Sequence, residues 1–129
     1  MKRHAAILLV LIAFTSCSEE FESKDPTAFN EKIAERTDIL SPEALIEIYY
    51  NYPKTEAPPL LTIESKSLGK DKFSVTLIHD KQQDDSQRAI KIVLLAQLND
   101  KKWEVEEIKT NRKCWEGRGH TDWGIEWCK

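Results

Sequence analysis

The stretch RAIKIVLLAQL, residues 88–98, decides the fold class of this chain. The positions on one side of it are all apolar: Ile90, Ile92, Leu94, Ala96 and Leu98. This alternation is typical of a β-strand with one face in a hydrophobic core. Val93 and Leu95 are apolar on the opposite side, so part of that face must be shielded as well. We therefore expect a long central strand.

Three more stretches with strand character lie around it, at residues 60–66, 72–79 and 102–110. In the second of them, Phe73, Val75 and Leu77 alternate with polar residues. Short polar segments separate the four strands, at residues 68–71, 80–87 and 99–100. Strands joined by such short turns predict a four-stranded antiparallel meander.

Two helices are expected before the sheet. Asp25 followed by Pro26 is a helix start signal, and the apolar spacing after it predicts a short helix over residues 26–36. Ser41-Pro42-Glu43 repeats that signal before a stronger apolar face, which ends before Pro53. The proline-rich residues 53–59 are expected to form a connector. Two helices followed by an antiparallel sheet predict an α+β domain, for which cystatin-like and nuclear transport factor 2-like folds are the nearest analogies.

The composition indicates one small globular domain of 129 residues. Lysine and arginine number 19 against 22 aspartates and glutamates, so nucleic-acid binding is not expected. With 32% charged and 40% hydrophobic residues, the chain is neither a disordered tail nor a bundle of membrane helices.

The first residues have the pattern of an export signal. Lys2 and Arg3 precede an apolar run at residues 5–14, which is shorter than the roughly 20 residues of a membrane-spanning helix. Thr15-Ser16-Cys17 follows and resembles the lipobox of bacterial lipoprotein signal peptides. This resemblance implies that residues 1–16 are removed and that Cys17 carries lipid, which would anchor the protein to a membrane of the cell envelope. Cleavage elsewhere, or an uncleaved anchor, is the alternative.

The chain has three cysteines, an odd number. If Cys17 carries lipid, Cys114 and Cys128 are left to form a disulfide, as an oxidising compartment favours. Residues 17–24 are then expected to be a polar, acidic tether, and residues 25–129 the folded domain. The acidic residues after Cys17 also resemble surface-export signals of some lipoproteins, and a plain linker is the alternative.

The C-terminal segment 114–128 differs from the rest of the chain because it holds three of the four tryptophans and three of the four glycines. Its pattern, Cys-x-x-Gly-Arg-Gly-His-x-Asp-Trp…Cys, occurs together with Asp84-Asp85-Ser86. This combination resembles a family of small exported bacterial proteins over residues 79–128. The resemblance implies export and marks the motif residues, but it implies no reaction.

The candidate site residues are Asp84, Asp85, Ser86, Trp115, Arg118, His120, Asp122 and Trp123. Glycines on both sides of Arg118 allow its guanidinium to approach a carboxylate pair or an anionic ligand. Arg118 and His120 could fasten the loop to the Asp84-Asp85 turn, form a binding site or serve catalysis. The tryptophans either fill a hydrophobic cluster under the loop or form a stacking platform for a sugar or peptide.

No metal or cofactor is expected, because no two histidines lie at ligand spacing. The leading hypothesis is a non-enzymatic cell-envelope lipoprotein, a binding or accessory module that presents its tryptophan-rich loop to an envelope protein or a small ligand. The alternative is a small hydrolase that uses His120 with Asp84 or Asp122 and holds an anion with Arg118. In a third hypothesis the motif only supports folding.

Overall fold

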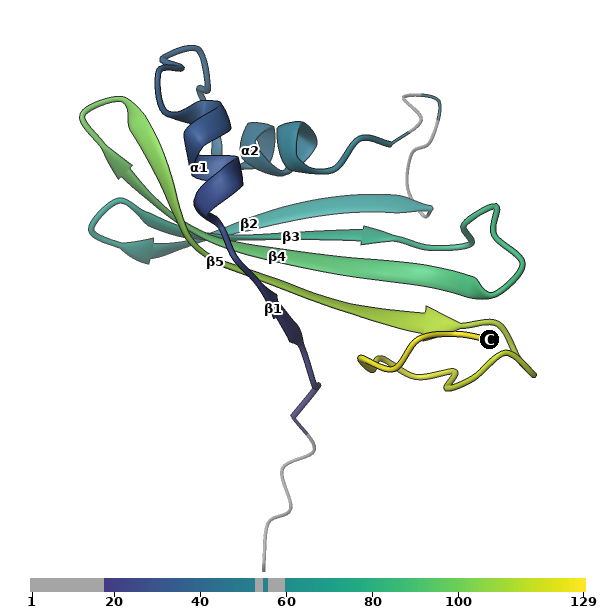
Figure 1. Ribbon diagram of the computed structural model, residues 1–129. Coiled ribbons are helices and arrows are strands. Elements are labelled where there is room, and N and C mark those ends of the chain that lie inside the picture. Colours follow the sequence, from purple (N-terminus) through teal and green to yellow (C-terminus); the bar gives the residue numbers. More distant parts are fainter. Residues whose placement is uncertain (1–17, 53–54, 56–59) are drawn as a thin grey trace, which may run out of the picture.

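The computed structural model describes residues 18–52, 55 and 60–129. These residues form, in chain order, β1 (Glu22–Lys24), α1 (Thr27–Ile33), α2 (Pro42–Tyr49), β2 (Leu61–Gly69), β3 (Lys72–His79), β4 (Gln87–Asn99) and β5 (Lys102–Cys114). The strands make one antiparallel sheet in the order β1-β5-β4-β3-β2. Both helices lie over the same face of this sheet, which we call the inner face (Figure 1). The predicted α+β class is confirmed.

The meander from β2 to β5 is also confirmed, with β4 at its centre. Ile92, Leu94 and Ala96 of β4 are buried on the inner face, and Ile90 and Leu98 pack beside them. Leu45 and Ile46 of α2 are fully buried in the same core. The alternation along residues 88–98 therefore exists because one face of β4 carries the helices.

Strand β1 was not expected, because Glu22–Lys24 lies in the segment predicted to be a tether. It pairs with the edge of β5, with Glu22 opposite Thr110 and Lys24 opposite Ile108. Farther along the same edge, the Asn30 side chain takes the place of a strand: its Nδ2 donates to the Val105 carbonyl at 2.8 Å, and its Oδ1 accepts from the Val105 amide at 2.8 Å. The N-terminal residues thus cover an edge that would otherwise be unpaired.

Strand β5 is longer than the predicted 102–110 and ends at Cys114. The residues near the end of β5 are polar, yet Asn111 is fully buried and Arg112 is 3% exposed. The reason is tertiary: Asn111 donates to the Glu20 carbonyl at 3.0 Å, and the C-terminal segment lies against the edge of β5 at Arg112.

The second helix begins as predicted, since the Ser41 hydroxyl accepts from the Ala44 amide at 3.2 Å. The first helix ends at Ile33, earlier than the predicted residue 36. The connection after it is fixed to the sheet where the buried Trp103 indole donates to the Ile39 carbonyl at 3.0 Å.

Within the described residues, no helix combines the length and apolar character needed to cross a membrane. The predicted signal peptide, Cys17 and all of the connector 53–59 except Thr55 lie outside the described residues.

Candidate functional site

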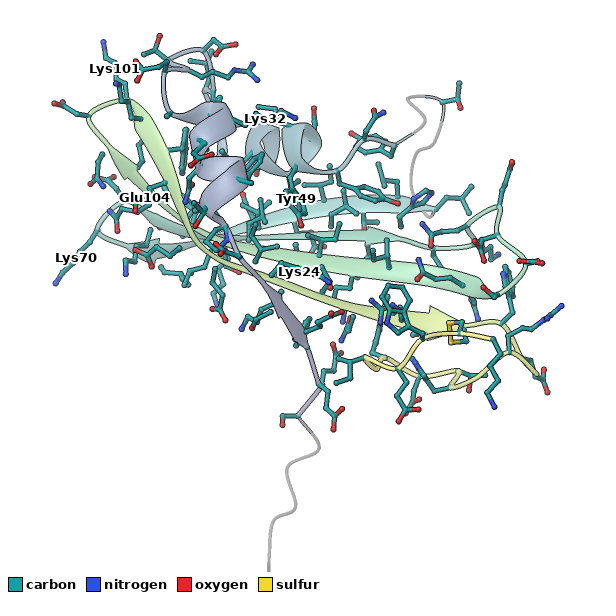
Figure 2. All side chains as sticks on the ribbon, viewed as in Figure 1. Lys24, Lys32, Tyr49, Lys70, Lys101 and Glu104 are labelled. Carbon is teal, nitrogen blue, oxygen red and sulfur yellow. A yellow bond between two sulfur atoms is a disulfide. The ribbon has the colours of Figure 1, made fainter. Side chains whose placement is uncertain are left out.

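The predicted disulfide is confirmed: Cys114 and Cys128 are joined, with their Cα atoms 5.5 Å apart (yellow bond in Figure 2). The loop that it closes runs back along the edge of β5 beyond β1. Arg112 and Gly124 exchange backbone hydrogen bonds of 2.8 and 3.0 Å, and the Cys114 amide donates to the His120 carbonyl at 2.8 Å. The loop is therefore an irregular extension of the sheet rather than a free appendage.

Two glycines of the motif are required by this path. Gly117 and Gly119 both have positive φ, at 81° and 141°, a region that other residues rarely adopt. A Cβ on Gly119 would also lie 3.0 Å from the Cys114 sulfur. The spacing of the glycines in the motif thus has a structural cause.

His120 fastens the loop from within. Its Nδ1 lies 2.8 Å from the Asp122 carbonyl oxygen and its Nε2 lies 2.9 Å from the Glu126 carbonyl oxygen. A carbonyl only accepts, so both ring nitrogens donate when the imidazole is protonated. The Glu126 carbonyl, and then the Asp122 carbonyl, raise the pKa of His120 above its ordinary value of 6.5.

The raised pKa of His120 makes a pH-dependent contribution to stability. A group whose pKa is higher in the folded state stabilises fully below its unfolded pKa, and this contribution is lost as pH rises through the folded pKa. We expect the urea midpoint of the wild type to fall relative to that of His120→Gln as the pH rises from about 5 to about 9. Taking the difference in urea midpoint between the two proteins cancels the contributions of the other titrating groups. Parallel pH profiles of the two midpoints would contradict this role of His120.

The turn between β3 and β4 meets the disulfide loop, as the antiparallel layout predicts. Asp84 closes this turn by accepting from the Ser86 amide at 2.8 Å and from the Gln87 amide at 2.7 Å. The hydrogen bond from the Gln87 amide, followed in size of effect by the one from the Ser86 amide, holds the pKa of Asp84 below its ordinary value. The link to the loop is Trp115, whose indole donates to the Asp84 carbonyl at 2.8 Å and whose amide donates to the Ser86 carbonyl at 2.9 Å.

The expected ion pair between Arg118 and the Asp84-Asp85 turn is not formed. Arg118 is exposed, and its guanidinium makes no hydrogen bond or ion pair with any residue that the structure describes. The cation at this turn is instead Arg88, which pairs with Asp80 at 3.1 Å and lies 5.6 Å from the centre of the Trp115 ring. Asp85 and Asp122 are likewise exposed.

The three tryptophans of the loop lie in three different places. Trp115 contacts the β3–β4 turn, whereas Trp123 faces Lys91 and Lys113, whose ammonium groups lie 4.3 and 4.7 Å from its ring centre. Trp127 lies over Arg112, with the guanidinium carbon 3.9 Å from the ring centre. No ring-to-ring contact joins the three tryptophans, so they do not form one shared cluster or one shared platform.

A cleft on the inner face lies between the sheet, the end of α2 and the loop, and has a volume of about 480 Å³. Its apolar and aromatic lining consists of Tyr49, Tyr50, Ile90, Ile92 and Trp127. Its polar lining consists of Lys24, Gln87, Thr110 and Arg112. Figure 2 labels Lys24 on β1 and Tyr49 at the end of α2, two of the lining residues.

Two residues that line this cleft each have a buried polar atom without a hydrogen-bond partner. Among the described residues, the buried side-chain atoms without a hydrogen bond are Thr110 Oγ1, Asn111 Oδ1 and Arg112 Nε. Thr110 and Arg112 line the cleft and are 5% and 3% exposed. Because an unpaired buried polar group is costly, such atoms usually have a function or a missing partner.

Comparison with models of protein families, with curated proteins and with solved structures finds no match to this chain. The chemistry of the site must therefore be inferred from its own residues.

The Arg112 guanidinium is held in place around its free Nε. Its Nη1 donates to the Ile125 carbonyl, and its Nη2 lies 3.3 Å from a Glu22 carboxylate oxygen. Lys24 approaches the same carboxylate at 2.9 Å. Lys24, and then Arg112, hold the pKa of Glu22 below its ordinary value, so Glu22 is ionised at neutral pH. Two cations thus share one carboxylate at this end of the cleft.

A hydrogen-bonded chain continues the polar edge of the cleft. The Tyr50 hydroxyl lies 3.0 Å from His79 Nδ1 and accepts from Gln82 Nε2 at 3.0 Å. Gln87 Nε2 donates in turn to Gln82 Oε1 at 2.7 Å. This chain holds Tyr50 and Gln87 in fixed positions at the edge of the cleft.

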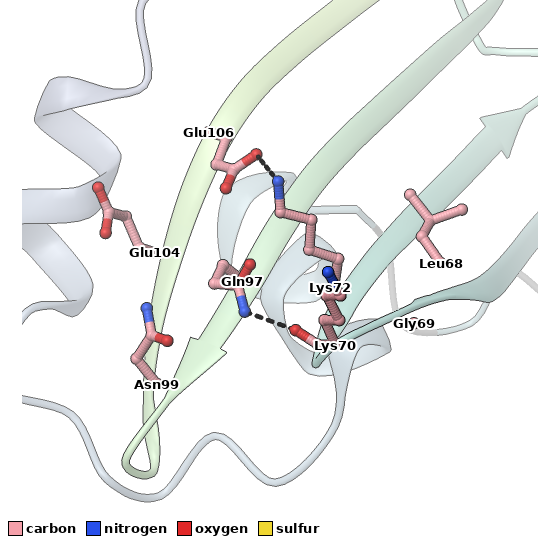
Figure 3. A pocket seen from close by; sticks show the side chains of 8 residues that line it. All are labelled: Leu68, Gly69, Lys70, Lys72, Gln97, Asn99, Glu104 and Glu106. Carbon is pink, nitrogen blue, oxygen red and sulfur yellow. Dashed lines mark hydrogen bonds and ion pairs between the residues drawn. The ribbon is translucent and has the colours of Figure 1, made fainter.

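A larger hollow, of about 630 Å³, lies where the β2–β3 and β4–β5 hairpins meet (Figure 3). Its polar groups pair with one another: Lys72 with Glu106 at 3.2 Å, and Gln97 Nε2 with the Lys70 carbonyl at 2.8 Å. None of the unpaired buried atoms lies there, so this hollow has less of the character of a site.

Sequence reasoning placed the candidate site on the loop and missed the cleft beside it. Thr110 and Arg112 lie just before the motif, at positions that continue the inner-face alternation of β5 beyond Ile108. Extending the strand to Cys114 would have placed a threonine and an arginine on the face of Ile90 and Ile92. The described residues hold no group of three histidine, cysteine, aspartate or glutamate side chains arranged for a metal ion.

Proposed function

We propose that this protein is an exported, membrane-anchored binding module that holds a small molecule in the cleft. The observation that carries the proposal is that two residues lining that cleft, Arg112 and Thr110, each have a buried atom without a hydrogen-bond partner, Arg112 Nε and Thr110 Oγ1. Aromatic and aliphatic side chains beside a few directed polar groups are the composition expected of a small-molecule site. The disulfide supports export, because such bonds persist mainly outside the cytoplasm.

In this proposal the C-terminal loop builds the cleft rather than recognising a partner by itself. It contributes the Trp127 ring and the Ile125 carbonyl that holds Arg112. Its disulfide, its glycines and His120 keep these two residues in place. The loop therefore acts on function through the shape of the cleft.

The geometry favours binding over hydrolysis. Both His120 nitrogens face carbonyl oxygens within the loop, so neither is directed at a substrate. The Ser86 hydroxyl donates to Asp84 at 3.0 Å as part of the turn, and not to a histidine. No observation in the described residues favours the hydrolase hypothesis.

An NMR screen with mixed fragments tests the proposed site. Neutral, cationic and anionic fragments are added to the ¹⁵N-labelled protein with its disulfide intact, and amide and indole shifts are followed. We expect hits that shift Ile92, Thr110 and the Trp127 indole while Arg118 is unaffected. Hits confined to the Arg118 end of the loop, or no hits at all, would refute the cleft as the binding site.

The membrane anchor has its own test. We expect Cys17→Ala to move the protein from the detergent phase to the aqueous phase in phase partitioning, because the lipid rather than the acidic protein surface holds it to the membrane. The disulfide between the other two cysteines leaves Cys17 as the odd thiol and supports this proposal. Ser18→Ala is the matched control and should remain in the detergent phase. A Cys17→Ala protein that partitions like the wild type would show that the anchor is not at Cys17.

A further inference from the structure

The unpaired groups of the cleft also restrict the chemistry of its ligand, an inference that rests on the proposed function. Arg112 Nε can only donate a hydrogen bond, so its missing partner must be an acceptor. The Thr110 hydroxyl can donate to an acceptor as well. The two residues are two positions apart on β5, so their side chains project from the same face of the sheet. Their Cα atoms are about 7 Å apart along the strand.

The charged residues of the cleft also restrict the chemistry of the ligand. Lys24 and Arg112 line it, and Glu22 is the carboxylate that both of them contact, so one positive charge is left over. A neutral acceptor would satisfy the hydrogen bonds and leave this charge uncompensated beside the buried Arg112 guanidinium. A single negative charge would compensate it, and hydrogen bonds between charged groups are the stronger ones.

The number of free groups separates a carboxylate from a phosphate. Two unpaired donors match the two oxygens of a carboxylate, and one excess positive charge matches its single negative charge. A phosphate monoester has three free oxygens and close to two negative charges at neutral pH. It would leave an oxygen and a charge without a partner here.

The remaining lining describes the body of the ligand. Ile90 and Ile92 form an apolar floor on β4, and Tyr49 stands at the end of α2. Trp127 lies over Arg112 and is 73% exposed, an unusual exposure for so large an apolar ring. A flat or aliphatic group placed against this ring would remove its surface from water.

We infer that the cleft binds a small monocarboxylic acid with an apolar body: Arg112 Nε and the Thr110 hydroxyl donate to the carboxylate, and Trp127 covers the body. Lys24 adds positive charge at the β1 side of the cleft. The acid supplies the partners that the two buried groups lack.

Calorimetry with matched probes tests this inference on the full folded domain. The probes are phenylacetate and octanoate, each beside its neutral amide, together with benzylphosphonate, all measured at a pH above the second ionisation of the phosphonate so that it is a dianion. We expect each acid to bind the wild type about tenfold or more tightly than its amide, as one charged hydrogen bond allows. The phosphonate should bind more weakly than phenylacetate.

Variants then assign the contacts. Thr110→Val keeps the shape of the side chain and should weaken both acids about tenfold; the amides, whose carbonyl accepts the same hydrogen bond without a charge, should be weakened less. Because it removes an unpaired buried hydroxyl, its thermal midpoint should be at least that of the wild type, so weaker binding would not reflect unfolding. Thr76→Val, on the opposite face of β3, is the matched control and should bind like the wild type. Trp127→Ala should weaken acids and amides alike.

The outcomes separate this inference from the proposed function. Equal affinities for acid and amide, or fragment hits in the cleft from another chemical class only, would overturn the carboxylic acid and leave the cleft as the binding site. Tighter binding of the phosphonate would overturn the single negative charge. A cleft that takes neither these probes nor any screened fragment would overturn both proposals.

Discussion

Replacing both cysteines of the loop, Cys114→Ala together with Cys128→Ala, is expected to lower the free energy of unfolding by about 3 kcal/mol. The bond closes a segment with a sequence separation of 14, and losing it frees the unfolded chain. The sheet should persist, because the loop follows its last strand. Urea unfolding followed by circular dichroism measures the change.

A reductant supplies the control for this prediction. It should destabilise the wild type by a similar amount and leave the double variant unchanged. Binding of the proposed ligand in the cleft should be lost in both cases, because Trp127 and the Ile125 carbonyl are no longer held against Arg112. A wild-type midpoint that does not respond to reduction would show that the backbone contacts of the loop are sufficient without the bond.

Trp103→Ala is expected to destabilise the domain by about 3–5 kcal/mol, the range for removing a large buried aromatic side chain. Trp103 is 6% exposed and packs edge-on against Phe73, with the two ring centres 5.5 Å apart. Its indole nitrogen donates to the Ile39 carbonyl at 3.0 Å. Its removal leaves a cavity in the core and an unpaired carbonyl in the connection between the helices. Urea midpoints report the loss.

Trp127→Ala is the matched control, since it removes the same side chain from an exposed position. It should change the free energy of unfolding by only about 0.5 kcal/mol. Similar losses in the two variants would mean that Trp103 does not join the helices to the sheet as described. The pair also separates the stability of the fold from binding, because only Trp127 lines the cleft.

Local sequence patterns were sufficient for the centre of the fold. The alternation in residues 72–79 and 88–98 places their apolar side chains on one face, whatever packs against it. The helix start at Ser41 is likewise local, because the capping hydroxyl and the amide it bonds are three residues apart. These features depend on neighbouring residues, and they were predicted correctly.

The edges of the sheet could not be predicted in this way. Glu22–Lys24 is three polar residues long and has no periodicity of its own. It is a strand because the edge of β5 offers unpaired backbone groups at Ile108 and Thr110. The same pairing, together with the C-terminal loop, buries Asn111 and Arg112, which have the composition of a loop in the sequence.

The sequence by itself determined the α+β class, the disulfide and the meeting of the loop with the β3–β4 turn. All three follow from periodicity, cysteine count and strand direction. Only the tertiary structure decided which side chains meet: Trp115 and Arg88 take the places expected for Arg118, and Arg112 Nε and Thr110 Oγ1 are buried without hydrogen-bond partners on residues that line the cleft with Trp127. The path of the loop depends on backbone angles at Gly117 and Gly119 and on contacts between residues far apart in the chain, which no local pattern encodes.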